Sequence, residues 1–112
     1  METMHKIQTL EKLINLGIED GLIDKTLSKL IQYKTNKMER ELQELEDSMK
    51  KFESKYNMDT ETFYKKFEEG ELGDEMDFLE WYALCDMHKR IMQRLDIAKR
   101  GIDGAYADIS MN

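Results

Sequence analysis

The 112-residue chain contains no proline, a single cysteine and only two histidines. Without proline, no residue removes a backbone donor from a helix interior, so long uninterrupted helices are permitted. Cys85 cannot form a disulfide within the chain, which agrees with a reducing compartment. A disulfide-stapled scaffold is therefore excluded, and so is a zinc site built from cysteine and histidine pairs alone, because structural zinc requires four ligands.

Long apolar runs are also missing. No stretch approaches the roughly 18 residues that a membrane helix needs, and the start, METMHKIQ, lacks the apolar segment of a signal peptide. We therefore expect a cytoplasmic protein with no membrane partner. No strand is predicted, so there is no glycine-rich phosphate loop after a strand. No set of serine, histidine and acid suggests a nucleophile. The sequence predicts a protein that is not an enzyme and has no cofactor.

Charged residues make up 37% of the chain and hydrophobic residues 40%, which is typical of amphipathic helices. Apolar residues recur every three or four positions, the period of one helix face. We predict an all-α protein, in which an antiparallel hairpin of two long helices carries a short connecting helix and a short N-terminal helix. The predicted segments are a short N-terminal helix and turn over 1–23, a helical hairpin over 24–101 (long helix 24–57, short helix 60–69, long helix 75–100) and a flexible C-terminal tail over 102–112.

Capping residues suggest where these helices begin and end. Asp24, Asp59 and Asp74 each precede an apolar periodic stretch, where a carboxylate can accept hydrogen bonds from the free N–H groups of the first turn. Gly70 and Gly101 follow such stretches, and glycine commonly ends a helix. We predict that the three aspartates are N-caps and that the two glycines are stops.

Heptad spacing predicts the contact between the two long helices, because apolar residues in both alternate in steps of three and four. The predicted dimer and core seam comprises Met38, Leu42, Leu45, Met49, Phe52, Leu84, His88, Ile91 and Leu95. A two-helix hairpin leaves much of its seam in water. We therefore expect a homodimer that forms a four-helix bundle, with a monomer that uses the N-terminal helix as its third helix as the alternative.

The net charge of −7 is concentrated in one segment. Between Asn57 and Asp86 there are ten acidic residues and two lysines, a net charge of −8, which leaves +1 for the rest of the chain. Aromatic residues lie among these carboxylates, and charge combined with aromatic area suits a basic protein partner. The predicted partner-binding surface comprises Glu71, Asp74, Asp77, Phe78, Glu80, Trp81 and Tyr82. In the alternative, the aromatics cap the hairpin and the acids only face water.

Metals and nucleic acids fit the sequence less well. Cys85 and His88 lie three residues apart, as ligands of a small metal-responsive protein would, but no second pair accompanies them. The acidic stretch FEEGELGDEMDFLEW places Phe, Leu and Met where a calcium loop needs oxygen ligands. Lysines and arginines along both long helices alternate with acids, which indicates a solvated, salt-bridged face. We predict no metal site and do not expect nucleic acid as the main ligand.

Two segments, LINLGIEDGLIDKTLSKLIQYK and KFESKYNMDTETFYKKFEEGELGDEMDFLEWYALCDMHKR, carry a family resemblance over roughly residues 13–95. They resemble a family of short, mostly uncharacterised helical proteins of archaea and cyanobacteria, some of which are similar to antitoxin components of toxin–antitoxin pairs. In that family the helix after EW often carries tyrosine where this sequence has Cys85 and His88. The resemblance therefore argues against an obligatory metal site at those two residues.

Two function classes follow from these observations. The first is a non-enzymatic protein–protein interaction module, an antitoxin-like subunit whose acidic end neutralises a small basic toxin encoded nearby. The alternative is a self-assembling structural or regulatory coiled-coil protein without a ligand at its acidic end.

Overall fold

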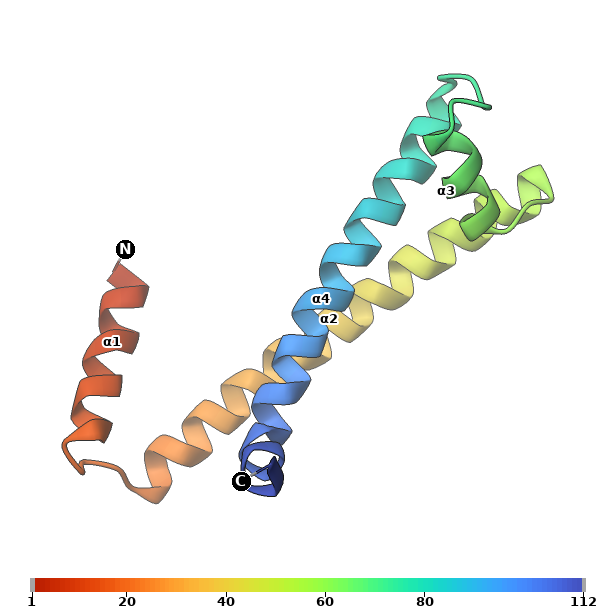
Figure 1. The fold of residues 1–112 in the computed structure, drawn as a ribbon. Coiled ribbons are helices and arrows are strands. Elements are labelled where there is room, and N and C mark those ends of the chain that lie inside the picture. The colour runs from red at the N-terminus through yellow and green to blue at the C-terminus, as the bar shows by residue number, and fades with distance from the viewer. Residues whose placement is uncertain (1, 112) are drawn as a thin grey trace.

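The computed structural model describes residues 2–111 of the chain, and it describes side chains as far as Gly101. All elements in this range are helices: α1 (Glu2–Asn15), α2 (Gly21–Tyr56), α3 (Thr60–Glu68) and α4 (Met76–Met111). α2 and α4 run side by side in opposite directions, and α3 lies at the end of the hairpin that they form (Figure 1). The predicted all-α fold is confirmed.

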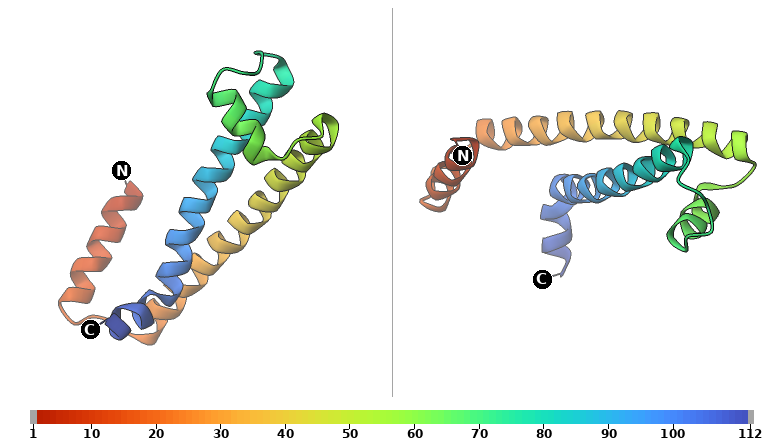
Figure 2. Two further views of the ribbon diagram at one scale, coloured as in Figure 1. Left: turned by 45° about the vertical axis from the view of Figure 1, so that its right-hand side comes forward. Right: turned by 90° about the horizontal axis from the view of Figure 1, so that it is seen from above.

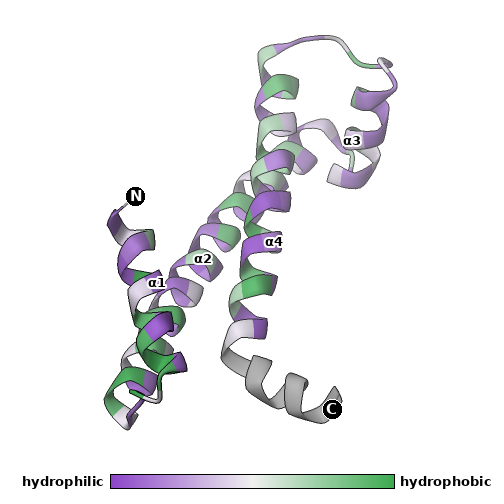
Figure 3. Ribbon diagram, turned by 60° about the vertical axis from the view of Figure 1, so that its left-hand side comes forward, coloured by the Kyte–Doolittle hydropathy of each residue, from purple (hydrophilic) through white to green (hydrophobic). Residues whose placement is uncertain are grey.

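α1 stands apart from the hairpin (Figure 2). It buries none of its residues, and its backbone packs against none of the other helices. A small pocket lined mainly by Ile7, Leu10, Ile14 and Leu27 separates α1 from the start of α2. Apolar positions on α1 and around its turn into α2 are visible in green in Figure 3. α1 therefore does not serve as the third helix of a closed monomer.

Capping explains where α2 and α3 begin. The Asp59 carboxylate accepts the N–H of Thr62 at 2.7 Å, and this bond lowers the pKa of Asp59. α2 begins three residues earlier than predicted, because Asp20 takes an extended backbone and accepts the N–H of Ile23 at 3.0 Å. The predicted cap, Asp24, lies inside the first turn instead, where its negative charge still interacts favourably with the helix dipole.

The boundaries of α4 differ from the prediction at both ends. The Glu75 carbonyl accepts the N–H groups of Phe78 and Leu79, the first bonds of the helix, so Asp74 lies before the cap position. At the other end the backbone is helical to Met111, where a flexible tail was predicted over 102–112; residue 112 lies outside the described range. Glycine ends a helix when it takes the left-handed conformation, as Gly70 does with φ 73°, whereas Gly101 keeps φ outside that region.

The core lies at the tip of the hairpin, where α3 meets α2 and α4. Its buried members are Phe63, Phe78, Trp81 and Cys85, and they are surrounded by Met49, Phe52, Tyr56, Met58, Phe67, Leu72 and Tyr82. An aromatic cluster of this kind concentrates a large apolar area in a small volume. All three helices therefore meet at one end of the molecule.

The seam between α2 and α4 continues away from this core. Leu45, Ile91 and Leu95 are buried in it, and the other predicted seam residues are partly buried. The seam was predicted to pass through Leu84, but on α4 Cys85 is the buried residue and Leu84 is partly buried. The inward-facing residues are Trp81, Cys85 and His88, which are spaced by four and then by three positions. Thr35 was not predicted; its hydroxyl donates to the Ile31 carbonyl at 2.8 Å, which satisfies it inside the seam.

Candidate interaction surface at the hairpin tip

Trp81 is the centre of the tip. Its side chain is 0% exposed and stacks on Phe63 of α3, with 3.9 Å between ring centroids and 5° between the ring planes. It also stacks on Phe52 of α2 at 5.6 Å. The indole Nε1–H donates to the Thr60 hydroxyl at 3.1 Å, so the polar atom of the ring is satisfied. Trp81 thereby joins all three helices of the tip.

The structure places Phe78 and Trp81, two of the predicted anchors for a partner, inside the core. Both side chains are buried in the core, where a partner cannot reach them. Tyr82 is half-buried: it stacks on Phe67 at 4.7 Å, and its hydroxyl donates to Glu68 at 3.2 Å. The aromatic residues of the acidic segment therefore build the tip instead of forming its outer surface.

Asp77 also has an internal role. Its Oδ2 accepts hydrogen bonds from Lys55 Nζ at 2.6 Å and from the Tyr56 hydroxyl at 2.5 Å, which connects the start of α4 to the end of α2. These bonds, with that from Lys55 the larger cause, lower the pKa of Asp77, and the same contacts raise the pKa values of Lys55 and Tyr56. Asp77 is thus engaged within the chain and contributes little free charge to a docking surface.

The remaining predicted carboxylates, Glu71, Asp74 and Glu80, are exposed. Among the described acidic residues from Asp59 to Glu80, Asp77 is the one that forms an ion pair. Leu79 is 46% exposed. Tyr64 of α3 is also exposed, and its ring stacks on that of Tyr82 of α4. Hydrogen bonding with Tyr82 and Glu68 raises the pKa of Tyr64 to about 12. The outer surface of the tip thus offers unpaired carboxylates with two partly exposed apolar side chains.

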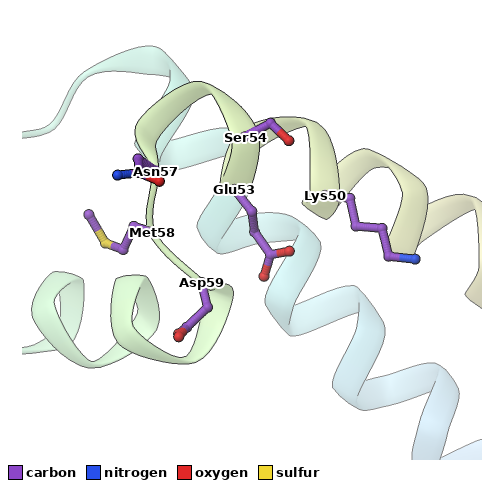
Figure 4. Close-up of a pocket in the computed structure, with 6 residues that line it drawn as sticks. All are labelled: Lys50, Glu53, Ser54, Asn57, Met58 and Asp59. Atoms are coloured by element: carbon purple, nitrogen blue, oxygen red, sulfur yellow. The ribbon is translucent and has the colours of Figure 1, made fainter.

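A pocket at the turn between α2 and α3 is lined by Lys50, Glu53, Ser54, Asn57, Met58 and Asp59 (Figure 4). Three of its residues, Glu53, Asn57 and Asp59, form hydrogen bonds that cap helices. Glu53 accepts the N–H of Thr60 at 2.7 Å, and Asn57 adopts a left-handed conformation with φ 50° so that its N–H reaches the Glu53 carbonyl. Asn57 suits this position, because asparagine tolerates the left-handed region better than most residues. We interpret the pocket as a capping structure.

Cys85 and His88 lie on the side of the hairpin that faces α3. Both line a pocket together with Met49, Thr60, Glu61, Tyr64, Asp86 and Lys89. Burial raises the pKa of the Cys85 thiol to about 11, and a protonated thiol is a poor metal ligand. His88 Nε2 lies 3.1 Å from Glu46 Oε2. Within the part of the chain that the structure describes, no three His, Cys, Asp or Glu residues are grouped so that they would hold a metal ion.

The chain matches no family model, no curated protein and no solved structure. In residues 2–111 no helix combines the length and the apolar composition needed to cross a membrane. The fold and the tip therefore define the class of the protein as an elongated all-α hairpin with an aromatic core at its acidic end.

Proposed function

We propose that this protein is a non-enzymatic protein–protein interaction module of the cytoplasm, antitoxin-like in that its acidic tip covers a small basic toxin. The observation that carries the proposal is the net charge of −8 between Asn57 and Asp86 on a tip that is built around an aromatic core. Carboxylates on a rigid support lose little conformational entropy when they bind. Their combined field also increases the rate of encounter with a positively charged partner.

The surface in contact with the basic partner differs from the one that the sequence predicted. Glu71 and Asp74, in the loop between α3 and α4, supply exposed charge. Leu79 and Tyr64 supply the apolar area in place of Phe78 and Trp81, because these two are internal. Limited apolar area with strong charge favours a complex that forms quickly and weakens as salt increases.

The tagged full-length chain should bind the protein encoded by the neighbouring gene. We expect the variant Glu71→Lys/Asp74→Lys to weaken this binding at least tenfold at low salt, measured by calorimetry. The matched control is Glu2→Lys/Glu11→Lys, which makes the same change of charge at exposed positions of α1. Absence of binding by the unmodified chain, or equal losses in the two variants, would contradict the proposal.

We also propose that the hairpin self-associates into a homodimeric four-helix bundle, which keeps the self-assembling coiled-coil protein as the second candidate. The chain exposes 9,054 Å², whereas a compact monomer of 13.3 kDa exposes about 6,500 Å². Its radius of gyration is 19.9 Å, against about 13 Å for a compact domain of this length. The surplus of about 2,500 Å² exceeds the roughly 800 Å² per partner that a stable interface buries.

A further inference from the structure

We propose that the outer face of α4 is the dimer interface, and that it pairs with the same face of a second, antiparallel copy of this chain about a two-fold axis at Met87. This inference rests on the proposed self-association and names the surface that performs it. The outer face of α4 carries three apolar residues that the hairpin leaves exposed: Met76 is 72% exposed, Met87 45% and Ile97 71%. None of the three lies in the core or in the buried part of the seam.

Heptad spacing places these residues on one face of α4. Glu80, Met87 and Arg94 are seven residues apart and form one row, and a second row consists of Met76, Ala83, Arg90 and Ile97. The two rows are offset by steps of three and four, which is the pattern of a coiled-coil seam. Met87 and the inward-facing His88 are adjacent, so the face is turned roughly 100° around the helix from the α2 contact.

The charges on this face select the antiparallel arrangement. Glu80 lies seven residues before Met87 and Arg94 seven residues after it, each about 10 Å along the helix. An antiparallel copy centred on Met87 therefore brings Glu80 opposite Arg94 of the partner subunit, and the two-fold axis makes this contact twice. A parallel copy would instead place Glu80 opposite the partner's Glu80, which is unfavourable. The side chains of Glu80 and Arg94 are both exposed, and within the described residues neither forms an ion pair.

The apolar residues of the face match under the same symmetry. Met76 lies eleven residues before the axis and Ile97 ten residues after it, so each apolar end meets the apolar end of the other copy. Beside the axis, Phe52, Leu84 and Met87 line a largely apolar groove between α2 and α4, together with Ser48, Lys51, Lys55, Glu80 and Ala83. No residue of α3 lines it. A flexible methionine side chain, such as the partner's Met87, suits an irregular groove of this kind.

The charge of the whole hairpin agrees with this arrangement. Segments 25–40 of α2 and 89–100 of α4 each carry a net charge of +4. They lie side by side, as the 3.3 Å ion pair between Lys99 and Glu39 shows. Arg40 and Asn57 are separated by about 25 Å of helix, well beyond the 8–10 Å over which salt leaves charges interacting. Within one copy the acidic segment and the basic segment of α4 meet at the ion pair between Arg90 and Asp86. The remaining basic residues of that end are placed to compensate the acidic tip of an antiparallel second copy.

Sedimentation of the full-length chain and of charge variants tests this interface. We expect a dimer whose dissociation constant rises at least tenfold in Glu80→Arg and in Arg94→Glu, because each change opposes like charges twice. An equimolar mixture of the two variants should restore the dimer, and so should the double variant, since both recreate opposite-charge pairs. The control is Glu61→Arg, which makes the same charge change at an exposed residue of α3. Circular dichroism verifies that every variant is folded.

A second variant reports the axis directly. Met87→Cys should form a disulfide-linked dimer on mild oxidation, whereas Lys89→Cys, two residues along the helix, should remain unlinked. A purely monomeric unmodified chain overturns self-association together with this interface. A dimer that is insensitive to Glu80→Arg and Arg94→Glu overturns the interface alone. Open polymers in place of a dimer overturn the closed two-fold arrangement.

Discussion

Replacing Trp81 by alanine tests whether the aromatic cluster is the element that holds the hairpin together. The indole is 0% exposed, stacks on Phe63 with 3.9 Å between centroids, and donates to the Thr60 hydroxyl. Truncating a buried tryptophan to alanine costs about 3–5 kcal/mol. Here the change also leaves the Thr60 hydroxyl without its donor. We therefore expect a loss near the upper part of that range.

A loss of this size is a large part of the free energy of unfolding, which is about 5–15 kcal/mol for a typical domain. The ratio of folded to unfolded chains should fall on the order of 1,000-fold, and the midpoint of thermal unfolding should fall by more than about 10 °C. Urea unfolding followed by circular dichroism measures the free energy. All samples must be compared at one protein concentration, since self-association would add to the apparent stability.

The matched control is Leu79→Ala, which removes a partly exposed side chain from the same turn of α4. Substitutions at such positions usually change stability by no more than about 0.5 kcal/mol. Trp81→Phe should fall between the two, since it keeps an aromatic ring but loses the hydrogen bond to Thr60. A cost for Trp81→Ala below about 1 kcal/mol, or one equal to that of Leu79→Ala, would show that the cluster is not the stabilising core.

Two further predictions concern titratable groups of the tip. The contacts with Lys55 and Tyr56 hold the pKa of Asp77 below its ordinary 3.8, so they stabilise the fold above that pH and cease to do so as the pH falls through the lowered value. Asp77→Asn should accordingly unfold at a lower temperature than the unmodified chain at pH 7, and the difference should shrink towards pH 2; a constant difference would contradict this account. Cys85, with its pKa raised to about 11, should react with a thiol reagent at pH 8 far more slowly in the folded chain than in urea, and equal rates would show that it is exposed.

The sequence predicted the helices well because their signals are local. Apolar residues spaced three and four positions apart indicate one face of a helix, whatever that face packs against. Asp59 caps α3 through a hydrogen bond to a residue only three positions away. The boundaries were less predictable. Asp20 and Asp24 are both suitable caps, and the backbone conformation at Asp20 decides between them. Likewise, Gly101 can end a helix but does not, because its conformation remains helical.

The burial of Phe78 and Trp81 could not be predicted from the sequence for a different reason. Four large apolar residues lie within five positions of one helix (Phe78, Leu79, Trp81 and Tyr82), so spacing alone shows that they cannot all point into one narrow seam. Whether the remaining face is exposed depends on where α3 lies. The position of α3 follows from Phe63 and Thr60, which contact Trp81 from about twenty residues away in the chain. No local pattern contains that information.

Residue type and spacing along one helix or loop were enough to predict the helical class, the heptad seam and the concentration of acidic residues in one segment. The packing of the helices shows which of the described carboxylates form no ion pair, which aromatics are internal, and that two basic segments lie side by side at the end away from the acidic tip. It also shows that Met87 lies on an exposed face of α4, apart from the buried residues of the seam. These features depend on which helix faces are covered, and coverage is a property of the packed helices rather than of any one of them.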